Sequence, residues 1–145
     1  MIIFGIDPGT ASMGYGIIKL EGKRSILKDY GVVKTKAGVE MHKRLGVLYT
    51  NLDDIAKKYT PDLIVVEKLF FNTNAKTAIT VGQARGVVML VAAHNNTNVV
   101  EYTALQAKKV IGGHGRADKK QMQEAVRKYL GMSQIIKSDD ANDGV

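Results

Sequence analysis

The sequence contains no cysteine and no tryptophan, and only 2 of its 145 residues are proline. Without cysteine the chain has neither a disulfide framework nor a thiolate metal site, and the composition fits a cytoplasmic setting. No apolar run reaches the roughly 20 residues that a membrane-spanning helix needs. The start at Met1-Ile2-Ile3 lacks the charged segment and the cleavage site of a signal peptide. We therefore expect no association with a membrane and interpret this start as a core strand.

Length and charge narrow the class of protein further. A chain of 145 residues predicts a single domain over residues 1–145, which can bury one core but cannot form two lobes with a cleft between them. The 21 Lys and Arg residues exceed the 14 Asp and Glu residues, giving a formal charge of +7. This excess predicts a polyanionic partner, although charge alone is equally consistent with a role in solubility.

The hydrophobic pattern predicts an α/β fold. Apolar and alternating runs predict five strands, at residues 1–6, 14–20, 25–34, 63–66 and 98–101. Apolar residues at spacings of three and four predict a helix from Met41 to the break before Pro61. Another helix is expected at 73–94, and the last begins near Ser138. Capping-box patterns at Thr103 and Asp118 predict the starts of two more helices, and the helix that starts at Asp118 is expected to end at Gly131. This order predicts a five-stranded mixed sheet with helices on both faces.

Four carboxylates lie where predicted strands end or a helix begins. Asp7 closes the first apolar strand, and Glu67 closes the strand that follows Pro61. If these strands are neighbours, the two side chains meet at one edge of the sheet, the usual place for an α/β site. Asp140 and Asp143 are three residues apart and would share one face of a helix.

Such a cluster is tolerable mainly when a hard cation neutralises it, because unpaired like charges repel one another. Ligands that are all oxygen atoms favour magnesium or manganese over zinc. Each acid alone has an ordinary explanation: Asp7 as a turn residue before Pro8, and Asp140 and Asp143 as first-turn acids of a helix. The set of four favours a metal site.

Five motifs occur in an order and spacing that resemble the RuvC family of Holliday-junction resolvases. They are Gly5-Ile6-Asp7-Pro8-Gly9-Thr10, Glu67 followed by Phe70-Phe71, Gly82-Gln83-Ala84-Arg85-Gly86, Gly115-Arg116-Ala117-Asp118-Lys119 and Asp140-Ala141-Asn142-Asp143. The resemblance covers essentially the whole chain and implies a ribonuclease-H-like nuclease fold. It also implies a homodimeric, magnesium-dependent crossover junction endodeoxyribonuclease that nicks two opposed strands of a four-way DNA junction during homologous recombination and DNA repair.

By this resemblance, the catalytic and metal-binding acids are Asp7, Glu67, Asp140 and Asp143. They would hold two Mg²⁺ ions, or Mn²⁺ in their place, about 4 Å apart for hydrolysis without a covalent nucleophile. The family also implies a partnership with the RuvA and RuvB branch-migration complex.

Other residues are assigned by the same resemblance. Lys108 and Lys119 match positions near the scissile phosphate, and an exposed helical lysine is the ordinary alternative. Phe70 and Phe71 would stack on unpaired bases, although paired phenylalanines are more often core residues. Independently of the resemblance, positive charge makes other residues candidates for a phosphate track along the DNA: Arg85, Arg116, Lys43, Arg44, Lys109 and Lys120. The helix with Gly82 and Gly86 resembles the dimer-forming helix of the family, unless it packs closely on the sheet.

The last helix is expected to be cut short at Val145. Three other functions remain open. The first motif also resembles the phosphate loop of actin-like ATPases and sugar kinases, which need two such lobes. A junction-binding protein without catalysis is a second possibility, and a ribonuclease-H-like nuclease that acts on RNA is a third.

Overall fold

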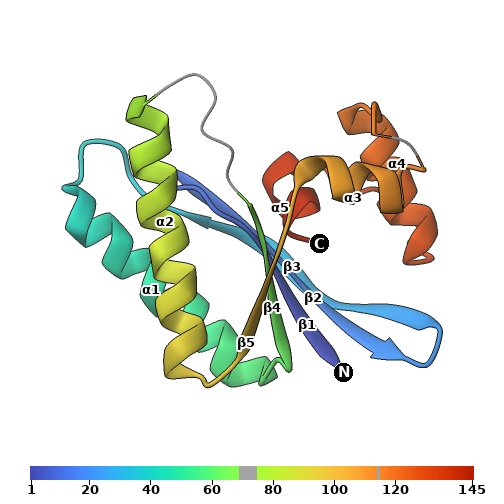
Figure 1. Cartoon of the computed structure of the whole chain (residues 1–145), viewed down its shortest axis with the longest axis horizontal. Helices are drawn as coiled ribbons and strands as arrows, with labels where there is room; N and C mark the ends of the chain where they lie inside the picture. The colour runs from blue at the N-terminus through green and yellow to red at the C-terminus, as the bar shows by residue number, and fades with distance from the viewer. Residues whose placement is uncertain (69–74, 114) are drawn as a thin grey trace.

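The computed structural model describes residues 1–68, 75–113 and 115–145. Within them the strands form one sheet in the order β3-β2-β1-β4-β5 (Figure 1). The strands β1 (Ile2–Asp7), β2 (Ser12–Glu21) and β3 (Arg24–Lys34) form an antiparallel meander, whereas β4 (Leu63–Glu67) and β5 (Asn98–Tyr102) run parallel to β1. This arrangement confirms the predicted five-stranded mixed sheet.

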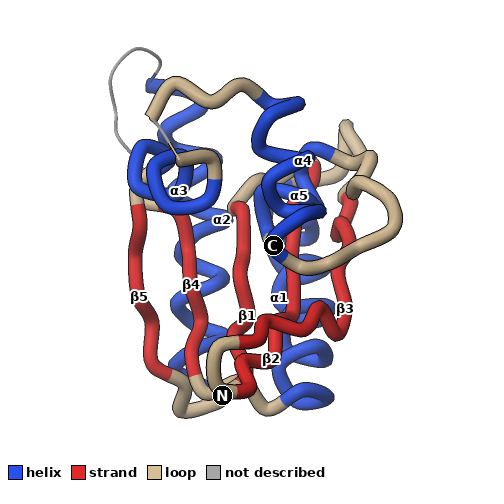
Figure 2. Tube along the Cα trace, turned by 90° about the vertical axis from the view of Figure 1, so that its right-hand side faces the viewer, coloured by secondary structure: helices blue, strands red, loops and turns tan. Residues whose placement is uncertain are grey.

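Five helices surround the sheet in the described part of the chain. They are α1 (Met41–Tyr59), α2 (Ala75–His94), α3 (Ala104–Ile111), α4 (Lys119–Tyr129) and α5 (Asp139–Gly144). The helices α1 and α2 cover one face, and α5 lies against the other face with α3 and α4 beside it (Figure 2). None of these helices has the length and apolar composition needed to cross a membrane.

Alternation along the strands divides the sheet into two faces. Phe4 and Ile6 of β1 and Ile64 and Val66 of β4 are fully buried in the main core, which they form with α1 and α2. On each strand, the residues that alternate with these buried ones therefore point to the other face of the sheet, which carries α5.

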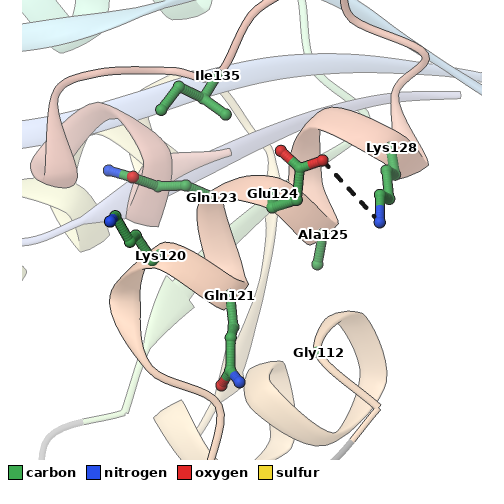
Figure 3. A pocket seen from close by; sticks show the side chains of 8 residues that line it. All are labelled: Gly112, Lys120, Gln121, Gln123, Glu124, Ala125, Lys128 and Ile135. Atoms are coloured by element: carbon green, nitrogen blue, oxygen red, sulfur yellow. Dashed lines mark ion pairs between the residues drawn. The ribbon is translucent and has the colours of Figure 1, made fainter.

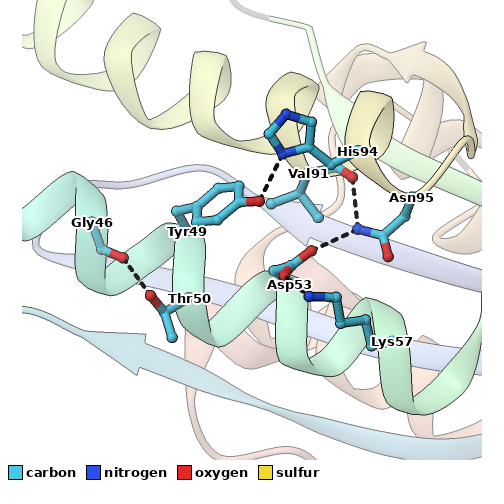
Figure 4. Close-up of polar contacts among 8 residues, drawn as sticks. All are labelled: Gly46, Tyr49, Thr50, Asp53, Lys57, Val91, His94 and Asn95. Atoms are coloured by element: carbon cyan, nitrogen blue, oxygen red, sulfur yellow. Dashed lines mark hydrogen bonds and ion pairs between the residues drawn. The ribbon is translucent and has the colours of Figure 1, made fainter.

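The helices α1 and α2 are joined by polar contacts near the end of α2 (Figure 4). The Asp53 carboxylate accepts a hydrogen bond of 2.8 Å from the amide of Asn95 and pairs with Lys57 at 2.6 Å. The Tyr49 hydroxyl and His94 Nδ1 are 2.7 Å apart. Because α2 ends where β5 begins, these contacts lie away from the ends of the strands that carry Asp7 and Glu67.

The predicted capping boxes are both confirmed. Thr103 accepts from the backbone of Gln106 at the start of α3, and Asp118 accepts from the backbone of Gln121 at the start of α4. Some boundaries differ from the prediction: β2 begins two residues earlier, β5 extends one residue further, and α4 ends at Tyr129. Gly131, predicted as the end of α4, adopts a φ of 63° in the following turn, a conformation that suits glycine.

The short helix α5 lies directly on the backbone of β1 and β2. A Cβ atom added to Gly5 would be 2.2 Å from the Gly144 carbonyl oxygen, and one added to Gly14 would be 1.6 Å from the Asp140 carbonyl oxygen. Glycine at these positions is therefore required for the approach of α5. Ala141 is only 2% exposed and belongs to a second apolar cluster on this face.

Candidate active site

Asp7 and Glu67 end two neighbouring parallel strands. Ile6 of β1 is the register partner of Val66 of β4, so the acids that follow them lie side by side. Ile6 and Val66 point into the main core. Since consecutive side chains alternate, Asp7 and Glu67 point to the opposite face, where α5 lies.

The other two acids reach the same place from α5. Its first turn is capped by Ser138, whose hydroxyl accepts a hydrogen bond from the Ala141 backbone. One oxygen of Asp140 accepts a hydrogen bond of 2.6 Å from the hydroxyl of Ser12 on β2. The hydroxyl of Tyr102, at the end of β5, donates to the Asp143 carbonyl at 3.4 Å. The chain thus gathers at one edge of the sheet acids that are more than 130 residues apart in sequence.

The acids are close enough to change one another's protonation. The pKa of Asp7 is raised from 3.8 to about 7, first by burial and then by the charges of Asp143, Glu67 and Asp140. Burial, followed by Asp143, raises the pKa of Glu67, and Lys108 opposes this shift. The pKa of Asp143, the most exposed of the four, is also raised, first by partial removal from water, and Lys119 opposes that shift.

The donor set fits a hard divalent cation. It consists of carboxylate oxygens, and their mutual repulsion is what a bound cation would relieve. Within residues 1–68, 75–113 and 115–145, however, no three Asp, Glu, His or Cys side chains are already close enough together to hold an ion.

Two lysines border the acids. Lys108, in the last turn of α3, is near enough to Glu67 to act on its pKa. Lys119 opens α4, is 79% exposed and forms an ion pair of 3.0 Å with Asp139, the residue before Asp140. Gln123 also donates to Asp139, at 2.9 Å. Both lysines thus lie near carboxylates at this edge of the sheet.

The remaining predicted contacts to DNA are placed differently. Arg116 is exposed in the connection between α3 and α4. Arg85 of α2 forms an ion pair with Glu101 of β5, so its guanidinium is already occupied in this structure. Phe70 and Phe71 lie outside the described residues.

Positive charge is concentrated on the segment that contains α3 and α4. Residues 103–137 contain eight Lys and Arg residues against two acidic residues, so this segment carries most of the formal charge of +7. A hollow of about 640 Å³ occurs on this segment (Figure 3), lined by Gly112, Lys120, Gln121, Gln123, Glu124, Ala125, Lys128 and Ile135. None of the four acids lines this hollow.

The structure also reveals positioning contacts that the sequence did not indicate. Ser12 and Tyr102 each contact α5, yet neither belongs to a recognisable motif. The loop after Asp7 is held by Thr35, whose hydroxyl donates to the Thr10 carbonyl at 2.5 Å and accepts from Arg44 at 2.8 Å. The β2–β3 register, which pairs Ser12 with Lys34, could have indicated that Thr35 lies near this loop.

Comparisons with known proteins identify the family of this chain. The sequence model of the family described as crossover junction endodeoxyribonuclease RuvC matches residues 3–145. The chain is 48% identical to the crossover junction endodeoxyribonuclease RuvC of Alkaliphilus oremlandii over 145 residues, which are all of this chain and 88% of that protein.

Two solved structures are similar over the whole fold. Thermus thermophilus RuvC superimposes with a TM-score of 0.91 at 30% identity, covering 99% of this chain and 89% of that one. The same protein in complex with a Holliday junction substrate gives a TM-score of 0.93 at 28% identity, with 99% and 88% covered. Because the family model matches residues 3–145 and a relative is 48% identical over the whole chain, the chain belongs to the RuvC family of crossover junction endodeoxyribonucleases.

Proposed function

We propose that this chain resolves four-way (Holliday) DNA junctions by metal-dependent hydrolysis of phosphodiester bonds in two opposed strands. The observation that carries the proposal is the gathering of four acids at the carboxyl ends of β1 and β4, where Asp7 has the other three as charged neighbours. Membership of the RuvC family and similarity to a structure that contains the junction support the choice of substrate.

The acids Asp7, Glu67, Asp140 and Asp143 would hold two Mg²⁺ ions, with Mn²⁺ as a substitute. Such ions, when bound, activate a water molecule and stabilise the leaving oxygen. Asp7 and Glu67 contribute rigidity, because both belong to strands inside the sheet. Asp140 and Asp143 come from α5, which is short and depends on its contacts with the sheet for its position.

Lys108 and Lys119 are proposed to hold the phosphate that is cut. An ammonium group acts as a point charge and can turn toward a phosphate oxygen without a fixed geometry. The ion pair of Lys119 with Asp139 keeps this lysine beside the acids while leaving it exposed to the substrate.

The arms of the junction are proposed to follow the positive segment of α3 and α4. Its excess of positive charge matches the phosphate backbone, and such contacts predict binding that weakens with salt. Arg116 is exposed in this segment, whereas Arg85 would first have to leave Glu101. Stacking of Phe70 and Phe71 on unpaired bases stays a proposal drawn from the family.

A homodimer would supply two active sites for the two opposed strands, with its two-fold axis on that of the junction. The surface that supports it is one side of α2. Ile79 is 65% exposed and Leu90 is 47% exposed, and Gly82 and Gly86 between them face open space. Helical spacing places all four on one side, where a second copy of α2 could approach closely.

A partnership with RuvA and RuvB is proposed on family membership alone. It predicts that junction cleavage by this chain is stimulated when RuvA and RuvB assemble on the same junction. Unchanged cleavage in their presence would contradict this part of the proposal.

The function is tested with the Asp7→Asn variant. We expect it to retain binding to a labelled junction on a native gel and to lose cleavage in Mg²⁺, because the amide removes one negative ligand and leaves the positive surface intact. Retained cleavage would refute the role of Asp7. Parallel assays of the parent chain for ATP hydrolysis and for cleavage of an RNA–DNA hybrid address the kinase-like and RNA-directed alternatives.

A further inference from the structure

Ser12 forms a contact with one of the four acids that no motif assigns. Its hydroxyl donates to Asp140 Oδ2 at 2.6 Å across 128 residues of sequence. We propose that Ser12 is a positioning residue, which fixes the orientation of the Asp140 carboxylate and leaves Oδ1 for a divalent cation. This inference rests on the metal-dependent function proposed above.

Ser12 is well placed to fix a side chain, because its own backbone is held on both sides. It is the first residue of β2 and pairs with Lys34 of β3. The preceding residue, Ala11, accepts a backbone hydrogen bond of 3.0 Å from Thr35. The Thr35 hydroxyl also donates to the carbonyl of Thr10 at 2.5 Å. The backbone that carries the Ser12 hydroxyl therefore has little conformational freedom.

The hydrogen bond has the geometry expected of a hydroxyl donating to an ionised carboxylate. Such bonds are typically about 2.5–2.7 Å long and are stronger than those between neutral groups. A serine hydroxyl can donate one hydrogen bond, and here the acceptor is the Asp140 carboxylate. Lys119, the nearby cation, instead pairs with Asp139. Ser12 thus holds Asp140 beside the other acids without neutralising its charge.

Docking of α5 does not explain this contact by itself. The backbone of α5 already lies on Gly14, where an added Cβ would be 1.6 Å from the Asp140 carbonyl oxygen. Ala141 and Val145 pack in the second apolar cluster on the same face. Because the helix has these independent attachments, the Ser12 hydroxyl acts mainly on the carboxylate.

A hydrogen bond to a ligating carboxylate changes the affinity for the metal. Removal of such an outer partner commonly costs about 10- to 100-fold in affinity. We therefore expect Ser12→Ala to bind Mn²⁺ about 10- to 100-fold more weakly than the parent chain, measured by calorimetry or by electron paramagnetic resonance without DNA. Ser12→Thr, which keeps a hydroxyl, should bind within about threefold of the parent.

Ser25→Ala serves as the matched control, because Ser25 pairs with Leu20 near the other end of β2. Its Mn²⁺ affinity should equal that of the parent. If Ser12→Ala fails to fold, Ser12→Thr and Ser12→Val replace it, since they share a shape and differ in the hydroxyl. Thermal unfolding checks that each variant is folded.

Equal Mn²⁺ affinity in the parent and in Ser12→Ala, with or without a lower unfolding temperature, would overturn the inference while leaving the proposed function intact. Equal affinity in Ser12→Thr and Ser12→Val would overturn it in the same way. If the parent chain binds no Mn²⁺ at all, the proposed metal site and the role of Ser12 are both refuted.

Discussion

Asp7 and Glu67 stand next to each other at the ends of parallel strands, one step beyond the register pair of Ile6 and Val66. Their side chains share the face opposite the main core, and α5 brings Asp140 and Asp143 to that face. The arrangement concentrates negative charge that the fold alone does not neutralise. Several measurable properties depend on this charge.

The first prediction concerns stability and pH without metal. The pKa of Asp7 is 3.8 in the unfolded chain and about 7 in the fold, so between these values the folded chain holds a proton that the unfolded chain releases. Stability should therefore fall as pH rises from about 4 through about 7. Allowing for screening by solvent, Asp7→Asn should be more stable than the parent by about 1 to 2 kcal/mol at pH 8.

Chemical unfolding in a metal chelator at pH 5 and at pH 8 measures this difference. Asp54→Asn is the control, because Asp54 is exposed on α1 away from the strand ends that carry the acids. A parent chain that is equally stable at both pH values, or an Asp7→Asn variant that is less stable at pH 8, would contradict the predicted repulsion.

The second prediction concerns added metal. On the proposed site, Mg²⁺ would bind the ionised carboxylates, so it should raise the unfolding temperature of the parent more at pH 8 than at pH 5. At saturating Mg²⁺ we expect a shift of several degrees at pH 8, which Asp7→Asn should largely lose. Scanning calorimetry in calcium-free buffer, with and without Mg²⁺, measures the unfolding temperatures of the parent and of Asp7→Asn. A shift of the same size in both chains would place the bound metal elsewhere.

The third prediction separates two adjacent lysines at the start of α4. Lys119 is tied to Asp139 beside the acids, whereas Lys120 lines the hollow on α4. Lys119→Ala should slow single-turnover cleavage of a bound junction by about 100-fold, as expected on removing one group that stabilises charge in the transition state. Lys120→Ala should slow it by less than about threefold and act mainly on binding. Equal rates for the two variants would contradict the assigned role of Lys119.

The fourth prediction concerns the dimer. A charge at Ile79 would be buried against the second copy of α2, so Ile79→Lys should raise the dimer dissociation constant by at least about tenfold. Val47→Lys is the control, since Val47 is an exposed apolar residue of α1. Light scattering over a range of concentrations reports the mass against 15.8 kDa for one chain. A parent chain that stays at that mass, or dimers of equal strength in both variants, would refute the α2 interface.

Local sequence patterns predicted much of this molecule. The apolar runs before Asp7 and Glu67 predicted strand ends, and the Thr103 and Asp118 capping boxes predicted helix starts that the structure confirms. These patterns succeed because each depends on residues a few positions apart. The strand ends at Ser12 and Tyr102 were missed because polar side chains there interrupt the apolar pattern.

Contacts between distant segments could not be predicted in the same way. Three contacts depend on how the sheet brings separate segments together. They are the hydrogen bond from Ser12 to Asp140, the ion pair of Arg85 with Glu101, and the close packing of α5 on Gly14. A serine or a glycine has the same local pattern whether or not a helix lies above it. The roles of the site residues stay predictions until the variants are measured.

Junction resolution by this chain is tested by cleavage of a four-way junction labelled on each strand in turn, with and without Mg²⁺, resolved on a denaturing gel. We expect Mg²⁺-dependent nicks at matching positions in two opposed strands, and no cleavage of a linear duplex of the same sequence. Junction binding without nicks at any Mg²⁺ or Mn²⁺ concentration would contradict it, and would indicate a protein that recognises the junction without cutting it.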